Sequence, residues 1–213
     1  MTTTTPREHG RLDKRNAIVE AAKHVFLRHG YTDASVDAIA AEARVSKQTI
    51  YNHFGDKAHL FRAVMHATVA ETGAGMGPPP GDDLAESDDL DRDLRRFGRQ
   101  LARGVLAPDI AAMRRVLIAE LDRHPELIEE WGTQGRELHR MLATAFARLN
   151  ERGVVDVPDP MLAAQQLVLL TAGNAMTLSR FGTDTPPSAA LDKAVDDGVE
   201  LWLRAYAVRP TER

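Results

Sequence analysis

The sequence predicts an all-α protein with about nine helices, arranged as a three-helix domain at residues 1–56 and a larger helical domain at residues 57–213. Apolar residues recur at i, i+3 and i+4 in most segments, which is the spacing of one helix face. Strand-like alternation extends nowhere over a useful length. A segment rich in Gly, Pro and acidic residues, 73–87, interrupts the helical pattern and predicts a loop or linker.

The composition is that of a chain able to bury a sizeable core, since 43% of its 213 residues are hydrophobic. Cysteine is absent, which excludes disulfides and thiolate metal sites and allows an intracellular protein. The N-terminus, MTTTTPREHGR, lacks the apolar core of a secretory signal, and no run of roughly 18 apolar residues predicts a membrane span. We therefore expect a cytoplasmic protein with no membrane partner.

Charge is distributed unevenly along the chain. Residues 1–66 carry ten Lys or Arg and seven Asp or Glu, a net charge of +3. The other 147 residues carry 17 and 24, a net charge of −7. Such asymmetry is expected when one end of a protein binds phosphates. The alternative is that a net charge of only +3 arises by chance.

Helical spacing first extends from Asp13 to His29, and this helix braces the two that follow. Gly30 comes next and is the usual residue for a left-handed helix C-cap. Residues 1–11 are polar and predict a flexible arm, which is either a solvated tail or a segment that follows DNA. The apolar stripe of the helix consists of Ile18, Ala21, Ala22, Val25 and Phe26.

Two short helices are predicted within residues 35–57. Ser35 and Ser46 are their N-cap candidates. Ile50 and Phe54 fall one turn apart on the second helix and are expected to point inward. A short helix with a polar outer face, braced by another short helix, is typical of a helix-turn-helix reader of DNA. The residues left on the outer face are Lys47, Gln48, Tyr51 and Asn52.

The segment 30–61, GYTDASVDAIAAEARVSKQTIYNHFGDKAHLF, resembles the N-terminal domain of TetR-family transcriptional regulators. The family often has Gly where Arg44 stands, so this chain departs from the pattern at the turn between the two short helices. The resemblance and the polar helix face together give the candidate DNA-binding residues Ser35, Ser46, Lys47, Gln48, Thr49, Tyr51, Asn52, His53 and Lys57.

The resemblance implies separate roles for these positions. Lys47 and Gln48 approach base edges, and their chemistry agrees, because Gln48 can donate and accept at an adenine edge and Lys47 can donate to guanine O6 and N7. The alternative for each residue taken singly is a solvated helix face, but the set on one short helix favours DNA contact. The phosphate contacts implied by the family are Ser35, Tyr51, His53 and Lys57.

The rest of the chain is predicted as helices only, with boundaries set by proline and glycine. Their approximate ranges are 56–72, 88–106, 110–124, 125–152, 160–180 and 192–207. Residues 113–181 are similar to the C-terminal domain of AefR-type members of the same family. This similarity implies a ligand-sensing and dimerising domain without catalytic activity.

The last two helices are expected to form a four-helix interface with a second copy of the chain. A reader helix that occupies a palindromic half-site requires a partner related by two-fold symmetry. The alternative is that these helix faces belong to the core of one subunit. The candidate interface residues are Leu167, Leu170, Leu178, Val195, Val199, Trp202 and Tyr206.

A ligand pocket is expected between the middle helices. Met and aromatic side chains are adaptable and suit an apolar binding site. Ordinary core is the alternative for each of them, because apolar helix stripes are usually buried against neighbouring helices. The candidate pocket residues are Phe97, Met113, Leu117, Trp131, Met141 and Met176.

The sequence carries no motif for catalysis or metal binding. It has no HExxH, GxSxG or phosphate loop, and its histidines show no recognised zinc spacing, so we expect no catalytic residue, metal or cofactor. We predict a homodimeric, sequence-specific transcriptional regulator, a repressor released from a palindromic operator by a small apolar or amphipathic ligand. The alternatives are a helical metal-dependent enzyme and an architectural DNA-binding protein without ligand response.

Overall fold

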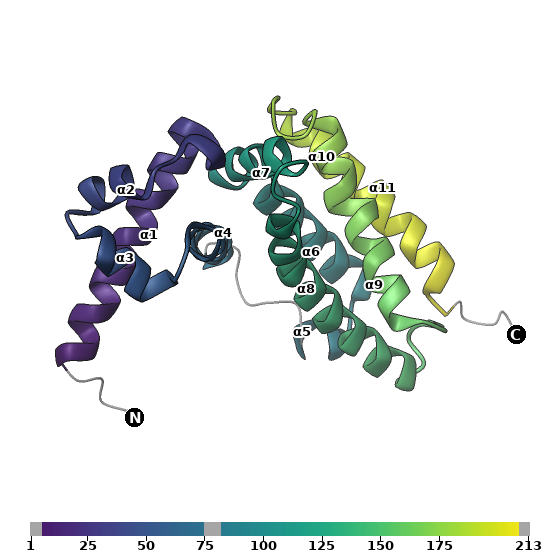
Figure 1. Ribbon diagram of the computed structural model, residues 1–213. Helices are drawn as coiled ribbons and strands as arrows, with labels where there is room; N and C mark the ends of the chain where they lie inside the picture. Colours follow the sequence, from purple (N-terminus) through teal and green to yellow (C-terminus); the bar gives the residue numbers. More distant parts are fainter. Residues whose placement is uncertain (1–5, 75–81, 209–213) are drawn as a thin grey trace, which may run out of the picture. The chain divides into compact units, whose positions relative to one another are not determined.

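Helices account for the regular structure of the chain in the computed structural model, which describes residues 6–74 and 82–208 (Figure 1). The described residues contain no strand beyond one isolated bridge between Val155 and Ala207. The chain divides into two compact units. Unit 1 comprises residues 1–71 and 112–132, and unit 2 comprises residues 72–111 and 133–213. The predicted all-α fold is confirmed.

Unit 1 contains α1 (Pro6–Asp33), α2 (Val36–Ala43), α3 (Lys47–Phe54) and most of α4 (Lys57–Ala74). It also takes in the last part of α7 (Pro108–Glu120) and the first part of α8 (Glu126–Glu151).

The first helix is longer than the sequence predicts. It begins at Pro6 instead of Asp13, so part of the predicted arm 1–11 is helical, and residues 1–5 lie outside the described residues. Proline suits the first turn of a helix, where its missing N–H has no partner to lose. Gly30 has a φ of 74° and a ψ of −178°, so the helix is interrupted at this glycine, but with an extended ψ instead of the predicted left-handed C-cap conformation.

The core of unit 1 joins residues from both of its chain segments. Ile18, Phe26 and Ile50 are almost completely buried within the three N-terminal helices. Three side chains from the second segment, Met113, Leu117 and Leu127, belong to the same hydrophobic cluster. Unit 1 is therefore larger than the predicted domain 1–56.

Unit 2 contains α5 (Asp82–Ala85), α6 (Leu90–Val105), α9 (Pro160–Val168), the π-helical turn η1 (Leu169–Gly173), α10 (Asn174–Leu178) and α11 (Ser188–Tyr206), with the remaining parts of α7 and α8. The short helix α5 lies in the predicted loop 73–87, of which residues 75–81 are outside the described residues.

One predicted helix, 160–180, forms three segments in the structure. The side chain of Thr171 donates to the carbonyl of Leu167 at 2.7 Å, and Asn174 donates to the carbonyl of Leu170 at 2.8 Å. These bonds satisfy carbonyls where the π turn η1 widens the helix. The segment Pro160–Leu178 is long and apolar enough to cross a membrane by length and composition, although a third of its residues are buried in the protein.

Two glycines allow close packing in unit 2. A Cβ atom on Gly98 of α6 would lie 2.8 Å from Val195 Cγ1 and 3.0 Å from Thr171 Cγ2. A Cβ atom on Gly198 of α11 would lie 2.2 Å from the carbonyl oxygen of Leu170. The absence of a side chain at these positions lets α6, η1 and α11 approach one another.

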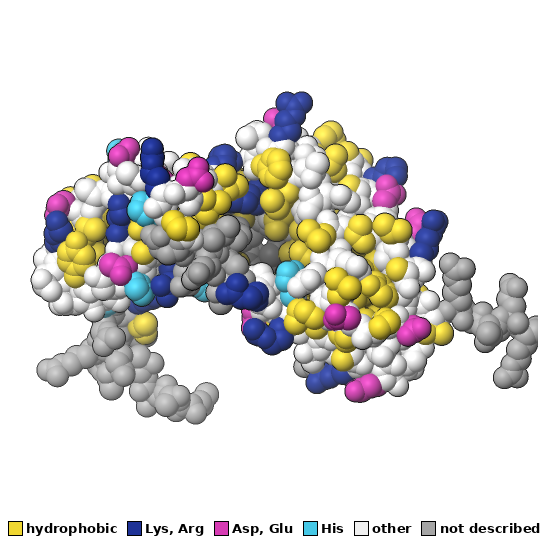
Figure 2. All heavy atoms as spheres, turned by 45° about the vertical axis from the view of Figure 1, so that its right-hand side comes forward, with side chains coloured by type: hydrophobic (Ala, Val, Ile, Leu, Met, Phe, Trp, Pro, Cys, Tyr) yellow, Lys and Arg dark blue, Asp and Glu magenta, His cyan; other side chains and the backbone are white. Residues whose placement is uncertain are grey.

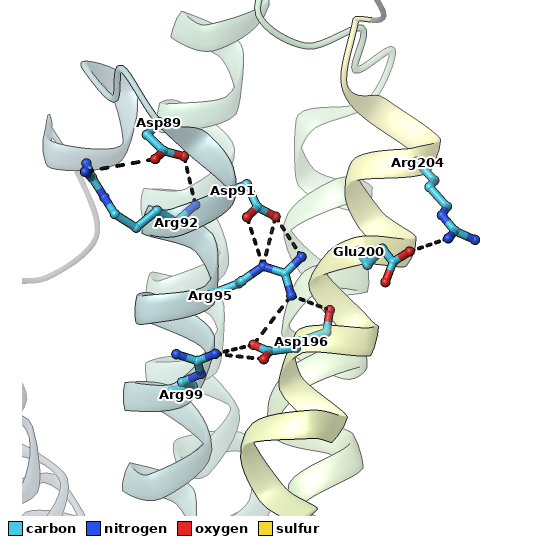
Figure 3. A network of polar contacts seen from close by, with 8 residues as sticks. All are labelled: Asp89, Asp91, Arg92, Arg95, Arg99, Asp196, Glu200 and Arg204. Carbon is cyan, nitrogen blue, oxygen red and sulfur yellow. Dashed lines mark hydrogen bonds and ion pairs between the residues drawn. The ribbon is translucent and has the colours of Figure 1, made fainter. Parts of the chain in front are cut away.

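Ion pairs follow the contact between α6 and α11 (Figure 3). Arg95 binds Asp91 on its own helix at 2.8 Å and Asp196 of α11 at 3.6 Å, while Arg99 binds both carboxylate oxygens of Asp196 at 2.7 Å. Arg103 adds a pair with Asp192 at 3.0 Å. Partly exposed pairs contribute little singly, so we assign this network mainly to fixing the register of the two helices.

A buried carboxylate stabilises the start of α6. Asp93 is 6% exposed and accepts from the Ser87 hydroxyl at 2.7 Å and from Arg92 Nε at 3.3 Å, and Arg96 lies 3.4 Å away. The hydrogen bond from Ser87, followed by those cations, lowers the pKa of Asp93.

Acidification is expected to remove the contribution of Asp93 to stability. Because its pKa is lowered on folding, the stabilisation is present above the unfolded pKa, about 3.9, and is lost as the pH falls through the lower folded value. Urea unfolding from about pH 7 to about pH 2 should show Asp93→Asn losing less free energy of unfolding than the parent below about pH 4. Equal losses in the two proteins would contradict this role.

Candidate nucleic-acid interface

The start and end of α2 are both fixed by local hydrogen bonds. The Ser35 hydroxyl oxygen accepts from the N–H of Ala38 at 3.0 Å, as an N-cap does. At the other end, Arg44 adopts the left-handed conformation with φ 54°, and its N–H donates to the carbonyls of Ala40 and Ala41. Arg44 thus provides the backbone conformation that glycine would take at this turn.

The orientation of α3 is set by its cap and its buried face. Ser46 accepts from the Thr49 N–H at 3.1 Å, and the two hydroxyls lie 2.8 Å apart. Ile50 and Phe54 are 1% and 8% exposed, so they hold the inner face of the helix against unit 1. The opposite face, which carries the predicted contacts, is consequently directed to solvent.

The outer face of α3 carries polar side chains that hydrogen-bond to one another or to α2. Lys47 Nζ donates to Asp37 Oδ2 of α2 at 3.0 Å, and this hydrogen bond together with the negative charge raises the pKa of Lys47. Gln48 Nε2 donates to Asn52 Oδ1 at 2.9 Å. Tyr51 is 39% exposed beside them. The predicted reader residues therefore lie together on one accessible face.

Three other candidates have structural roles besides any contact with DNA. Ser46 and Thr49 form the cap of α3, and Ser35 caps α2 while its hydroxyl hydrogen can still be donated outward. His53 is half-buried, with its ring 6.0 Å from that of Phe54.

The predicted phosphate contact of Lys57 does not fit its surroundings. Its ammonium group donates to the carbonyls of Tyr31, Thr32 and Ala34 at 2.8, 3.1 and 3.3 Å, and it lies 4.5 Å from the centre of the Tyr31 ring. Burial lowers the pKa of Lys57. An ammonium group has three donors, and here all three are used within the protein, so we do not include Lys57 among the proposed phosphate contacts.

Several residues that support this face give no signal in the sequence. Glu42 of α2 binds His24 at 3.2 Å and also pairs with Arg28, which joins α2 to α1. The guanidinium group of Arg15 on α1 packs 5.3 Å from the centre of the Phe54 ring. These partners are far apart in the sequence, and no local pattern connects them.

The predicted dimer residues require a correction, because four of them are buried inside one subunit. Leu167, Val195, Val199 and Trp202 are at most 1% exposed, and the Trp202 indole donates to the carbonyl of Ala163 at 2.9 Å. Their side chains form intrachain core and are not available to a partner. Leu170 and Tyr206 are half-buried and Leu178 is 44% exposed.

The predicted pocket residues belong to different clusters. Phe97 lies in the core of unit 2, whereas Met113 and Leu117 lie in the core of unit 1. Met141 and Met176 are half-buried, and the side chain of Trp131 lies outside the described residues. That these six line one pocket remains a prediction.

A different hollow is present on the surface of unit 2. It is an apolar groove of about 370 Å³ between the α9–η1 segment and α11. The Tyr206 hydroxyl donates to Gln166 Oε1 at 2.5 Å beside it. The lining residues are Gln166, Leu169, Leu170, Leu201, Trp202, Ala205 and Tyr206. Among the residues that the structure describes, no group of three His, Asp or Glu is placed to hold a metal ion.

Comparison with known proteins gives one family match for the N-terminal part of the chain and one for the C-terminal part. Residues 18–64 match the family described as bacterial regulatory proteins, tetR family, and residues 92–208 match the C-terminal domain of AefR-like transcriptional repressors. These families contain transcriptional regulators and not enzymes.

Individual relatives show the same similarity. An HTH-type transcriptional repressor of Streptomyces coelicolor is 42% identical over 65 residues, which cover 30% of this chain and 34% of that protein. A solved structure of a TetR-family regulator from Mesorhizobium loti has a TM-score of 0.81 at 30% identity, covering 93% of this chain and 98% of that one. The flavonoid-responsive regulator FrrA has a TM-score of 0.78 at 28% identity, covering 93% and 99%. The chain belongs to the TetR family of bacterial transcriptional regulators, with an AefR-like C-terminal domain.

Proposed function

We propose that this protein is a cytoplasmic, homodimeric repressor that binds a palindromic operator and is released by a small molecule. The observation that carries the proposal is the exposed polar face of α3, which the Ser46 cap and the buried side chains of Ile50 and Phe54 hold toward solvent. A rigid helix of this kind can lie in the major groove of DNA. We assign base contacts to Lys47 and Gln48.

Other side chains of the same face suit contacts with the DNA backbone. We propose that Ser35, Tyr51 and His53 bind phosphates, while Ser46, Thr49 and Asn52 orient the reader face. Phosphate contacts carry no sequence information but fix the position of the protein on the duplex. The logarithm of operator affinity should therefore fall linearly with the logarithm of the salt concentration, with a slope proportional to the number of phosphates neutralised.

A second copy of the chain is proposed to cover the apolar face of unit 2. Figure 2 shows hydrophobic side chains gathered on the face that carries α9 to α11. Leu169 and Leu201, which line the groove between η1 and α11, are 66% and 55% exposed. Large exposed apolar patches mark interaction surfaces. A two-fold pairing through this face would provide the symmetry that a palindrome requires.

The released state requires a ligand that distinguishes two arrangements of the protein. A ligand shifts such an equilibrium only by the difference in its affinity for the two states. The flavonoid response of the similar regulator FrrA supports an apolar or amphipathic ligand for this chain as well. Phe97, Met141 and Met176 of unit 2 are proposed as residues near its site.

Replacing Gln48 by alanine is expected to weaken specific binding by roughly 1–3 kcal/mol and to relax the base preference at one position, because a bidentate contact to a base edge is lost. The measurement is a fluorescence-anisotropy titration with the duplex that the parent selects from a random-sequence pool. The control is Gln100→Ala on α6, which makes the same Gln-to-Ala change in unit 2, outside the proposed DNA-binding face. This variant should retain parental affinity. Parental affinity and preference in Gln48→Ala would exclude α3 as the reader.

A further inference from the structure

Residues 31–34, which follow the break at Gly30 and lead from the end of α1 into α2, are called the turn below, and a carboxylate from a distant part of the chain holds them. Glu120, the last residue of α7, accepts from the Thr32 hydroxyl at 2.7 Å and from the Thr32 N–H at 3.2 Å. Glu120 is 7% exposed, so this charged group is almost completely buried. A buried carboxylate is stable when such donors satisfy it, and here both come from one residue of the turn.

The same turn is held from its other side by α4. Lys57 at the start of α4 donates to the carbonyls of Tyr31, Thr32 and Ala34, so Thr32 is bound by Glu120 through its N–H and by Lys57 through its carbonyl. The Tyr31 ring is 4% exposed and lies 4.8 Å from the ring of His124, which follows α7. The turn is thus fixed between the start of α4 and the end of α7.

This turn is close in sequence to α2, which packs on the reader helix α3, so a displacement of the turn would also displace α2 and α3. Ser35, three residues after Thr32, is the N-cap of α2, and α2 packs on α3. At its other end, α7 extends without a break from residues 108–111 of unit 2 into residues 112–120 of unit 1. Glu120 therefore connects the residues that precede α2 to the last residue of α7 within unit 1.

We propose that Glu120 is a positioning residue for operator recognition, which fixes α2 and α3 relative to the end of α7 through its two hydrogen bonds to Thr32. This role rests on the proposed DNA-binding function. It differs from a purely stabilising role in one respect. If Glu120 positions the reader, its loss must reduce the preference for the selected duplex even where the protein is fully folded.

The test compares Glu120→Gln, Thr32→Val, the double variant and Thr32→Ser with the parent, each as the full chain. Affinities for the selected duplex and for a random duplex are measured at a temperature where circular dichroism shows every variant folded. Glu120→Gln and Thr32→Val should each reduce the selected-to-random affinity ratio about tenfold, a size typical of coupling between sites. The double variant should lose no more than either single variant, and Thr32→Ser, which keeps the hydroxyl, should restore the ratio.

A matched control and the salt dependence separate positioning from other effects. Asp122→Asn changes the charge by the same amount two residues beyond Glu120, at an exposed position, and should retain the parental ratio. The salt dependence of binding should keep its slope in all variants, because no phosphate contact is removed. An unchanged ratio in Glu120→Gln and Thr32→Val, or equal losses on both duplexes, would overturn the inference. A parent protein that prefers no duplex would instead overturn the proposed function itself.

Discussion

Gly198→Ala is expected to destabilise unit 2 by about 3 kcal/mol, near the upper end of the usual cost of overpacking a core. The added Cβ would lie 2.2 Å from the Leu170 carbonyl oxygen and 2.9 Å from its carbon. These are backbone atoms of the π turn η1, so no side-chain rotation can relieve the clash. The helices α11 and η1 must move apart, which also disturbs the burial of Val195 and Val199.

Chemical denaturation of the full chain measures this effect, and Gly135→Ala provides the matched control. Gly135 lies within α8 at an exposed position, and a Cβ there meets nothing within 4 Å. Alanine at that position should stabilise the helix by roughly 0.5–1 kcal/mol, since glycine loses more backbone entropy on folding. If the two substitutions changed the free energy of unfolding alike, the close approach of α11 to η1 would not be a determinant of stability.

Introducing glutamate at both Leu169 and Leu201 is expected to convert the proposed dimer to monomers and to reduce operator affinity by roughly 10²- to 10⁴-fold, the factor that linking two half-site interactions typically provides. The two leucines are exposed on η1 and α11 and line the same groove. In a two-fold interface each substitution appears twice, so four carboxylates would be buried near one another without partners.

Sedimentation velocity gives the oligomeric state, and anisotropy with the selected duplex gives the affinity. Ile118→Glu is the control, because Ile118 is 51% exposed on the part of α7 that belongs to unit 1. This variant should remain dimeric. A Leu169→Glu, Leu201→Glu double variant that stayed dimeric and bound the operator with parental affinity would show that a different surface makes the dimer.

The sequence predicted the helices α2 and α3 well because their determinants are local. Ser35 and Ser46 stand where N-caps are needed, and Ile50 and Phe54 are separated by one helical turn. Each of these signals involves residues within four positions of one another, the range over which hydrogen bonds and side-chain contacts in a helix act.

The contacts that the sequence could not predict join distant segments. Thr32 and Glu120 are separated by 88 positions, and nothing in either neighbourhood indicates the other. Lys57 looks like an ordinary exposed lysine at the start of a helix until the turn that it binds is known. Such pairs depend on how the helices pack, which helical spacing does not determine.

The helix α11 illustrates a second limit. It has apolar residues on more than one face, and spacing alone does not reveal which face meets the rest of the subunit. The structure places Val195, Val199 and Trp202 inward and Leu201 outward. Periodicity therefore identified the helix correctly, but three of the α11 residues that it assigned to the dimer interface belong to the core of the subunit.

The shared core of unit 1 restricts how its DNA-reading part can be transplanted into another regulator. Met113, Leu117 and Leu127 pack in the same cluster as Ile18 and Phe26. A chimera that took only residues 1–71 would expose the apolar surface these three side chains cover, and would leave Thr32 without its carboxylate partner. A functional chimera thus requires residues 112–132 of the donor to be transferred together with its residues 1–71.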